Sequence, residues 1–161
     1  MWLDPEVFEE VEHDHGAGAQ ALLVVMLASV AGGIGNVLAL SLLPGREVVW
    51  SSLLVVSAGF LVAWVAWSFI TMAIGTTFFG GRTDMGEMQR ALGFAATPGL
   101  LMVLPGIGLI VGLPWSLVAM VIAVRQACDF TTRRALATVL IGAAVLAIML
   151  VPASCALTAR L

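Results

Sequence analysis

The membrane topology of this chain is decided by residues 91–124, ALGFAATPGLLMVLPGIGLIVGLPWSLVAMVIAV, a stretch without a charged residue. As a single helix it would be about 51 Å long at about 1.5 Å per residue, whereas the hydrocarbon core of a bilayer is about 30 Å thick. Pro105-Gly106 stands near its middle, and Pro-Gly is a strong local break. The stretch therefore predicts a helical hairpin that turns at Pro105-Gly106.

The charges on both sides of this stretch support the hairpin. Arg82 and Arg90 precede it, and Arg125, Arg133 and Arg134 follow it. A hairpin places all of these bases on one face, as the positive-inside rule requires of a cytoplasmic face, whereas a single crossing would split them. We therefore expect two crossings here.

The composition of the whole chain belongs to an integral membrane protein. Of its 161 residues, 61% are hydrophobic and only 11% are charged, and the mean hydropathy is +1.08. Too few charged residues are available to cover the surface of a soluble domain. The formal net charge of -3 provides no basic patch, so nucleic acid is not an expected partner.

Apolar stretches of about 20 residues are long enough to span a bilayer. We therefore predict an all-α fold, a polytopic integral membrane helical bundle with five transmembrane helices, in a domain that covers residues 19–161. The third helix is short, so it must recruit residues 85–90, with Glu87 and Arg90 snorkelling to the interface. The expected location is the plasma (inner) membrane, with the N-terminus cytoplasmic and the C-terminus outside. The five expected helices cover about 19–43, 48–74, 86–104, 105–124 and 135–157.

Residues 1–18 are predicted to form an acidic cytoplasmic segment with a short amphipathic helix. Asp4 suits an N-cap and Pro5 the first helical position. Six acids and no base occur there, which is the wrong sign for anionic headgroups. We expect Val7, Phe8 and Val11 to dock this helix on protein. The segment lacks a basic n-region and a cleavage site, so the first apolar segment is expected to be retained as an anchor.

Few residues of the chain could carry chemistry. His13 and His15 could hold a ligand, but two histidines without a third ligand nearby do not encode a closed zinc site. Hydroxyl side chains in the helices have no histidine base beside them. We therefore predict no catalytic residue, no metal and no cofactor, and no disulfide between Cys128 and Cys155.

Small and polar residues in the helices indicate helix packing. Asn36 is the most polar side chain within a confidently predicted span, and it follows Gly35. An amide in lipid must find partners, so Asn36 is expected to link helices; a role in transport is the alternative. Gly108 and Gly112 are spaced by four in the hairpin and are expected to allow close packing.

The short motifs around the hairpin are similar to those of the Yip domain family, and the resemblance covers nearly the whole chain. Leu92-Gly93-Phe94 followed by Pro98 resembles its Leu-Gly-Tyr and proline pattern, with Phe94 in place of tyrosine. The positions that carry the resemblance are Gly80, Gly81, Arg90, Gly93, Phe94, Pro98, Arg125, Gln126, Asp129 and Arg134.

The resemblance implies a five-helix membrane protein without enzymatic activity, a scaffold or adaptor in contact with the lipid bilayer and other membrane proteins. Eukaryotic members bind Rab-type GTPases through a longer N-terminal region. This chain has a short one and contains no tyrosine, so it lacks the Tyr-Gly-Pro motif and Rab binding is not expected. Arginine-only basic usage indicates a bacterium or archaeon. Two alternatives stay open: an accessory subunit of a larger complex, such as a bioenergetic one, and a small transporter or channel.

Overall fold

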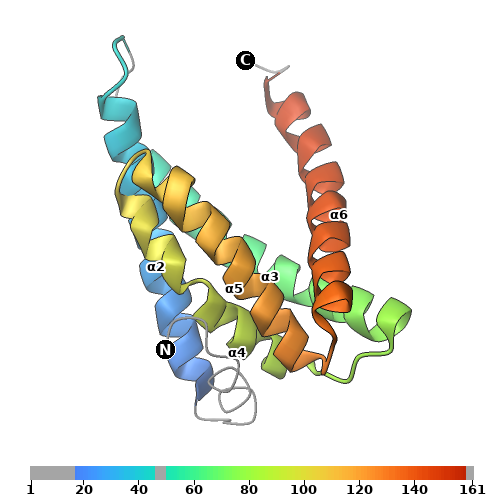
Figure 1. Cartoon of the computed structure of the whole chain (residues 1–161). Coiled ribbons are helices and arrows are strands. Elements are labelled where there is room, and N and C mark those ends of the chain that lie inside the picture. The colour runs from blue at the N-terminus through green and yellow to red at the C-terminus, as the bar shows by residue number, and fades with distance from the viewer. Residues whose placement is uncertain (1–16, 46–49, 159–161) are drawn as a thin grey trace.

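The computed structural model describes residues 17–45 and 50–158, with the side chains of the last helix described as far as Ile148, and this part of the chain is helical (Figure 1). Its elements in chain order are α2 (Ala17–Ser41), α3 (Ser51–Phe79), α4 (Met85–Ala95), the 3-10 helix η1 (Thr97–Val103), the π-helix η2 (Gly108–Gly112), α5 (Leu113–Ala127) and α6 (Thr132–Thr158).

Within the described residues, three helices are long and apolar enough to cross a membrane. These are α2, α3 and the continuous helix that η2 and α5 form over Gly108–Ala127. The structure therefore agrees with an all-helical membrane protein. The number of crossings, five by the sequence argument, stays a prediction.

The chain turns at Pro105-Gly106, as the sequence predicts. Gly106 has a φ of +83°, which suits a residue without a side chain. The N–H of Gly108 then donates to the carbonyl of Leu104 at 3.0 Å, and the N–H of Ile110 donates to the carbonyl of Gly106 at 2.9 Å. The two arms pack against each other, α4 on α5 and η1 on η2, and form the hairpin in Figure 1.

The first arm of the hairpin changes from α-helix to 3-10 helix after Ala95. Pro98 has no N–H for the carbonyl of Phe94, the α-helical partner four residues earlier. The hydroxyl of Thr97 donates to that carbonyl instead, at 2.6 Å. A 3-10 helix rises about 2.0 Å per residue, so α4 and η1 together reach about 30 Å. The arm that looked short in sequence is therefore long enough to span a bilayer.

Helix α2 lies close to the first arm because small residues face each other. A Cβ atom on Gly93 would lie 2.9 Å from the Cβ of Ala21, and one on Gly99 would lie 3.4 Å from the Cβ of Ala28. One heptad further along α2, a Cβ on Gly35 would meet the carbonyl oxygen of Met102. The seven-residue spacing keeps these contacts on one face of α2.

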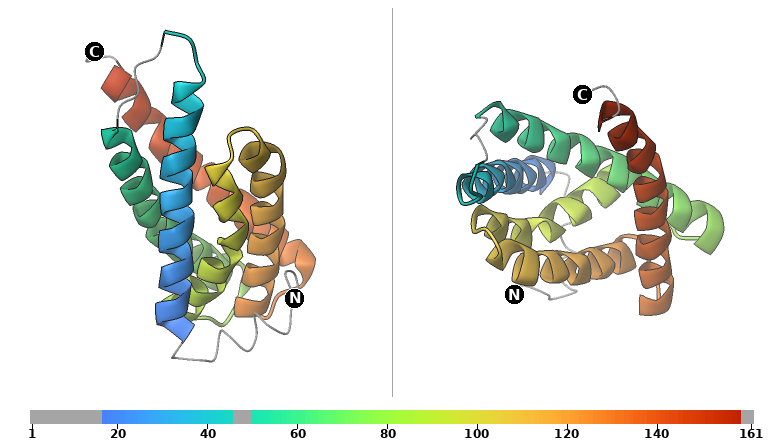
Figure 2. Two further views of the ribbon diagram at one scale, coloured as in Figure 1. Left: turned by 90° about the vertical axis from the view of Figure 1, so that its left-hand side faces the viewer. Right: turned by 90° about the horizontal axis from the view of Figure 1, so that it is seen from above.

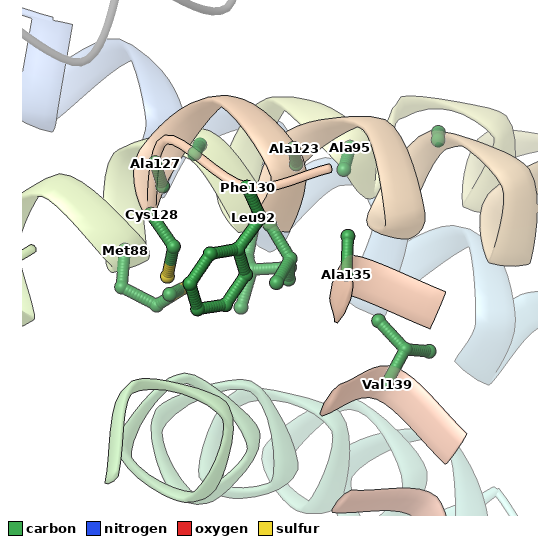
Figure 3. Packing of buried hydrophobic residues seen from close by; sticks show 12 residues of the cluster. Met88, Leu92, Ala95, Ala123, Ala127, Cys128, Phe130, Ala135 and Val139 are labelled. Atoms are coloured by element: carbon green, nitrogen blue, oxygen red, sulfur yellow. The ribbon is translucent and has the colours of Figure 1, made fainter. Parts of the chain in front are cut away.

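Helix α4 occupies the centre of the bundle, where α2, α3 and α5 all pack against it (Figure 2, right). Its Met88 and Leu92 are fully buried. Figure 3 shows them beside Cys128 and Phe130, which come from the connection between α5 and α6. The labelled cluster contains Met88, Leu92, Ala95, Ala123, Ala127, Cys128, Phe130, Ala135 and Val139. This buried hydrophobic cluster therefore joins α4 to the region where α5 passes into α6.

Candidate interaction site at the loop end of the bundle

Two connections far apart in sequence meet at one end of the bundle. A Cβ atom on Gly81, between α3 and α4, would lie 2.7 Å from Cζ of Phe130 and 3.0 Å from the Cβ of Cys128. The rings of Phe79 and Phe130 pack edge to face, with centroids 6.1 Å apart and planes at 75°. We call residues 79–84 and 125–134 together the loop cap.

The first half of the loop cap depends on two glycines with different tasks. Gly80 ends α3 in the left-handed conformation, with a φ of +70°. Gly81 leaves room for the Phe130 ring, and its N–H donates to the carbonyl of Gly75 at 3.0 Å. A side chain at position 81 would separate the two connections.

The second half of the loop cap is a Schellman motif at the end of α5. The N–H of Phe130 donates to the carbonyl of Arg125 at 2.8 Å, and the N–H of Asp129 donates to that of Gln126 at 3.1 Å. Asp129 has a φ of +53°, in the left-handed region that glycine favours and that aspartate tolerates better than most residues. This turn directs the ring of Phe130 into the core.

A capping box fixes the start of α4 directly after the loop. The N–H of Glu87 donates to Oδ1 of Asp84 at 2.8 Å, and the N–H of Asp84 donates to Oε2 of Glu87 at 2.8 Å. Both bonds satisfy backbone donors that the first turn of a helix leaves open. The loop between α3 and α4 is therefore held at both ends.

The loop cap carries exposed side chains of both positive and negative charge. Arg82, Asp84, Asp129, Arg133 and Arg134 are all exposed. They can reach a partner in water without moving the backbone that carries them. The loop cap is therefore a charged surface on a backbone that turns and caps hold in place.

Arg90 differs from what the sequence suggested. We expected it to snorkel to the interface with Glu87, but its side chain is only 9% exposed, on a helix that three others surround. The carboxylate of Glu87 takes part in the capping box. Arg90 is therefore a buried position of the bundle.

A comparison with protein families identifies the chain. The family model described as Yip1 domain matches residues 1–154. This chain belongs to the Yip1 domain family. No curated protein and no solved structure matches it significantly.

The positions at which we expected the family resemblance fall into two places in the structure. Gly80, Gly81 and Asp129 build the backbone of the loop cap. Gly93 and Pro98 belong to the hairpin arm on α2, where Gly93 allows close contact with Ala21. The sequence indicated the residues but not their contacts, because positions 81 and 130 are separated by two helices of the hairpin.

The packing candidates lie at helix contacts. Nδ2 of Asn36 donates to Oγ of Ser52 at 3.2 Å, which links α2 to the first turn of α3. A Cβ on Gly108 would lie 2.6 Å from the Cα of Met102, and one on Gly112 would lie 3.2 Å from the Cβ of Leu101. These glycines allow the two arms of the hairpin to pack closely against each other.

Sequence reasoning missed a second polar link between α2 and α3. The hydroxyl of Ser57 donates to the carbonyl of Ser29 at 3.0 Å, beside Gly33. In the sequence, the only indication of this link is the presence of serine residues within apolar helices.

Two expectations concern residues outside the part of the chain that the structure describes. They are the docking of the N-terminal helix by Val7, Phe8 and Val11, and a ligand role for His13 and His15.

Proposed function

We propose that this Yip1 domain protein is a non-enzymatic scaffold or adaptor that crosses the membrane five times and binds other membrane proteins through its loop cap. The observation that carries the proposal is the frame of the loop cap. Gly81 packs on Phe130, and a capping box and a Schellman motif fix the adjoining helix ends. The Yip1 domain family is a family of non-enzymatic membrane proteins.

The physical advantage of such a surface is its low ordering cost. Binding loses free energy when loops and side chains must be immobilised, so a backbone fixed in advance leaves more of the contact energy for affinity. Charges of both signs at the rim favour a complementary partner and repel a mismatched one. Arg82, Arg133 and Arg134 supply the positive part of that pattern.

The topology that this function requires has five crossings: α2, α3, the arm of α4 and η1, the arm of η2 and α5, and α6. The two connections of the loop cap lie at one end of the bundle, and the positive-inside rule assigns that end to the cytoplasm. The N-terminus is then cytoplasmic and the C-terminus outside, in the plasma (inner) membrane.

Photo-crosslinking in intact membranes tests the proposal. A photoreactive amino acid replaces Arg82 or Arg133 in the loop cap, and a control replaces Ile110, which is exposed near the hairpin turn. We expect defined protein adducts from the two loop-cap positions and lipid adducts from position 110. The same protein adducts from all three positions would contradict binding through the loop cap.

Neutralising substitutions then test whether binding depends on the positive charges of the loop cap. Arg82→Gln, Arg133→Gln and Arg134→Gln together should remove the adducts, and Arg46→Gln, between α2 and α3, should leave them unchanged. Adducts that persist in the triple variant would contradict recognition by these charges. A partner set that remains at fixed stoichiometry through detergent purification would support the alternative of an accessory subunit.

A further inference from the structure

The two arms of the hairpin change their helix type at the same level. The first arm passes from α4 into the 3-10 helix η1 beside Pro98, and the second passes from the π-helix η2 into α5 at Gly112. These two points are in contact, because a Cβ atom on Gly112 would lie 3.2 Å from the carbonyl oxygen of Pro98. We call the residues beyond them, 99–111, the hairpin tip. The hairpin tip lies at the end of the bundle opposite the loop cap (Figures 1 and 2).

The backbone is easier to bend at this level than elsewhere in the two arms. Bending a regular membrane helix breaks backbone hydrogen bonds, which lipid cannot replace. Pro98 in the first turn of η1 and Pro114 in the first turn of α5 have no N–H to donate. The N–H of Leu113 donates to the carbonyl of Gly108, five residues earlier instead of the usual four. A bend beside these two prolines therefore breaks fewer bonds than a bend within α4 or α5.

The two arms of the hairpin tip form one unit. A Cβ on Gly108 would lie 2.6 Å from the Cα of Met102 and 2.8 Å from the carbonyl oxygen of Leu101, so the two backbones are in close contact. The hydrogen bond from the N–H of Gly108 to the carbonyl of Leu104 closes the turn between the arms. Bending at the level of Gly112 would therefore move both arms together.

Few buried side chains fix the hairpin tip to the rest of the bundle. Within residues 99–111, only Gly99 and Gly108 are buried. The preceding helix α4, in contrast, buries Met88 and Leu92 completely. Segments that bury few apolar side chains open at a lower free energy than the core does. The hairpin tip is therefore the part of the hairpin that can separate while the core stays packed.

The hairpin tip covers part of α2. Gly35 of α2 is buried, and a Cβ there would overlap the carbonyl of Met102 in the tip. We propose that the hairpin tip is a lid that swings on Pro98 and Gly112, closed on α2 in this structure and open in a second state. Opening uncovers Gly35 and leaves the loop cap in place. The surface at one end of the bundle then changes while the surface at the other end stays fixed.

Distances between two spin labels test the lid. The chain carries alanine in place of Cys128 and Cys155, and the labels are attached to cysteines at Ile34 on α2 and Ile110 in the hairpin tip. Both positions are exposed, so the labels do not disturb the packing. Pulsed electron paramagnetic resonance in lipid nanodiscs then measures the distances of the closed and open states and their populations.

Matched glycine variants shift the lid. Gly35→Ala places a methyl group against the carbonyl of Met102, so it should raise the ratio of open to closed populations roughly tenfold. Gly32→Ala adds the same methyl group to the same helix with nothing within 4 Å, and should leave the parent distances unchanged. Equal distance distributions in the two variants would overturn the lid. If circular dichroism shows that Gly35→Ala does not fold, Ala28→Leu replaces it, because Ala28 is fully buried where Gly99 packs on α2.

A second pair of labels distinguishes a lid from general loosening of the bundle. Leu23 on α2 and Val118 on α5 are both exposed and lie on the loop-cap side of the hinge. Labels at these positions should give the same distance in Gly35→Ala as in the parent. A change as large as that of the first pair would overturn the lid.

Proline variants test the position of the hinge. Pro98→Ala together with Pro114→Ala restores two backbone donors, and should return Gly35→Ala towards the populations of the parent. Pro105→Ala, in the turn of the hairpin tip, is the control and should leave the populations of Gly35→Ala unchanged. An open population that is the same with and without Pro98 and Pro114 would overturn the assignment of the hinge.

Discussion

Gly35 and Gly32 lie on the same helix, but only Gly35 has no room for a side chain. A Cβ on Gly35 would overlap the backbone of Met102, whereas nothing lies within 4 Å of a Cβ on Gly32. Gly35→Ala should therefore lower the free energy of unfolding by about 1–3 kcal/mol, because the overlapping atoms are backbone. Gly32→Ala should raise it by about 0.5–1 kcal/mol, the gain from replacing a glycine within a helix. Unfolding in mixed detergent micelles measures both, and equal effects would contradict the contact between α2 and η1.

Asn36 and Ser52 provide a second test at the residue scale. Hydrogen bonds between membrane helices contribute about 0.6 kcal/mol on average and up to about 1.7 kcal/mol. A double-mutant cycle of Asn36→Ala and Ser52→Ala should give a coupling energy in this range. Ser41→Ala is the control, since Ser41 bonds within its own helix to the carbonyl of Leu38. Zero coupling, with loss of a measured solute flux in Asn36→Ala, would favour the transporter interpretation instead.

At the scale of the element, a single substitution can test the capping box that begins α4. Asp84→Ala removes the acceptor for the N–H of Glu87 and should lower the free energy of unfolding by about 1 kcal/mol. Thr83→Ala alters the adjacent half-buried position of the loop, whose hydroxyl bonds only to the neighbouring carbonyl of Asp84, and should change the free energy of unfolding by less than about 0.5 kcal/mol. Thermal unfolding followed by circular dichroism compares the two. If both variants unfold like the parent, the capping box does not hold the loop cap.

The positions of most helices could be predicted from hydropathy and breaks, but their ends depended on contacts. The second helix was expected over about 48–74, ahead of Gly80-Gly81, and α3 continues to Phe79, directly before these glycines. Within α3, a Cβ on Gly75 would lie 3.1 Å from Sγ of Cys128, so Gly75 allows close packing against the connection between α5 and α6. Gly80, with its positive φ, is the stop. The sequence indicates the break at Gly80-Gly81, but the contact that Gly75 makes depends on the assembled bundle.

The candidate site was predictable only in part, for the same reason. The motif residues of the loop cap were identified from their pattern, but its structure depends on Phe130 reaching Gly81 across the hairpin. The burial of Arg90 likewise follows from three helices closing around α4. Local patterns predict elements, whereas contacts between distant segments require the assembled bundle.

For the whole molecule, the decisive prediction is the side of the membrane on which each connection lies. Five crossings place Arg82 and Arg133 together in the cytoplasm, because the hairpin returns the chain to the side from which it entered. Single cysteines at these positions, in a chain with Cys128 and Cys155 replaced by alanine, should react with an impermeant maleimide only after the membrane is opened. Ser51→Cys, at the start of α3, should react in intact cells. If residues 91–124 crossed the membrane only once, Arg82→Cys and Arg133→Cys would react from opposite sides. The two halves of the loop cap would then lie on different sides of the membrane and could not be in contact. Their common contact through Gly81 and Phe130 makes that outcome incompatible with the fold.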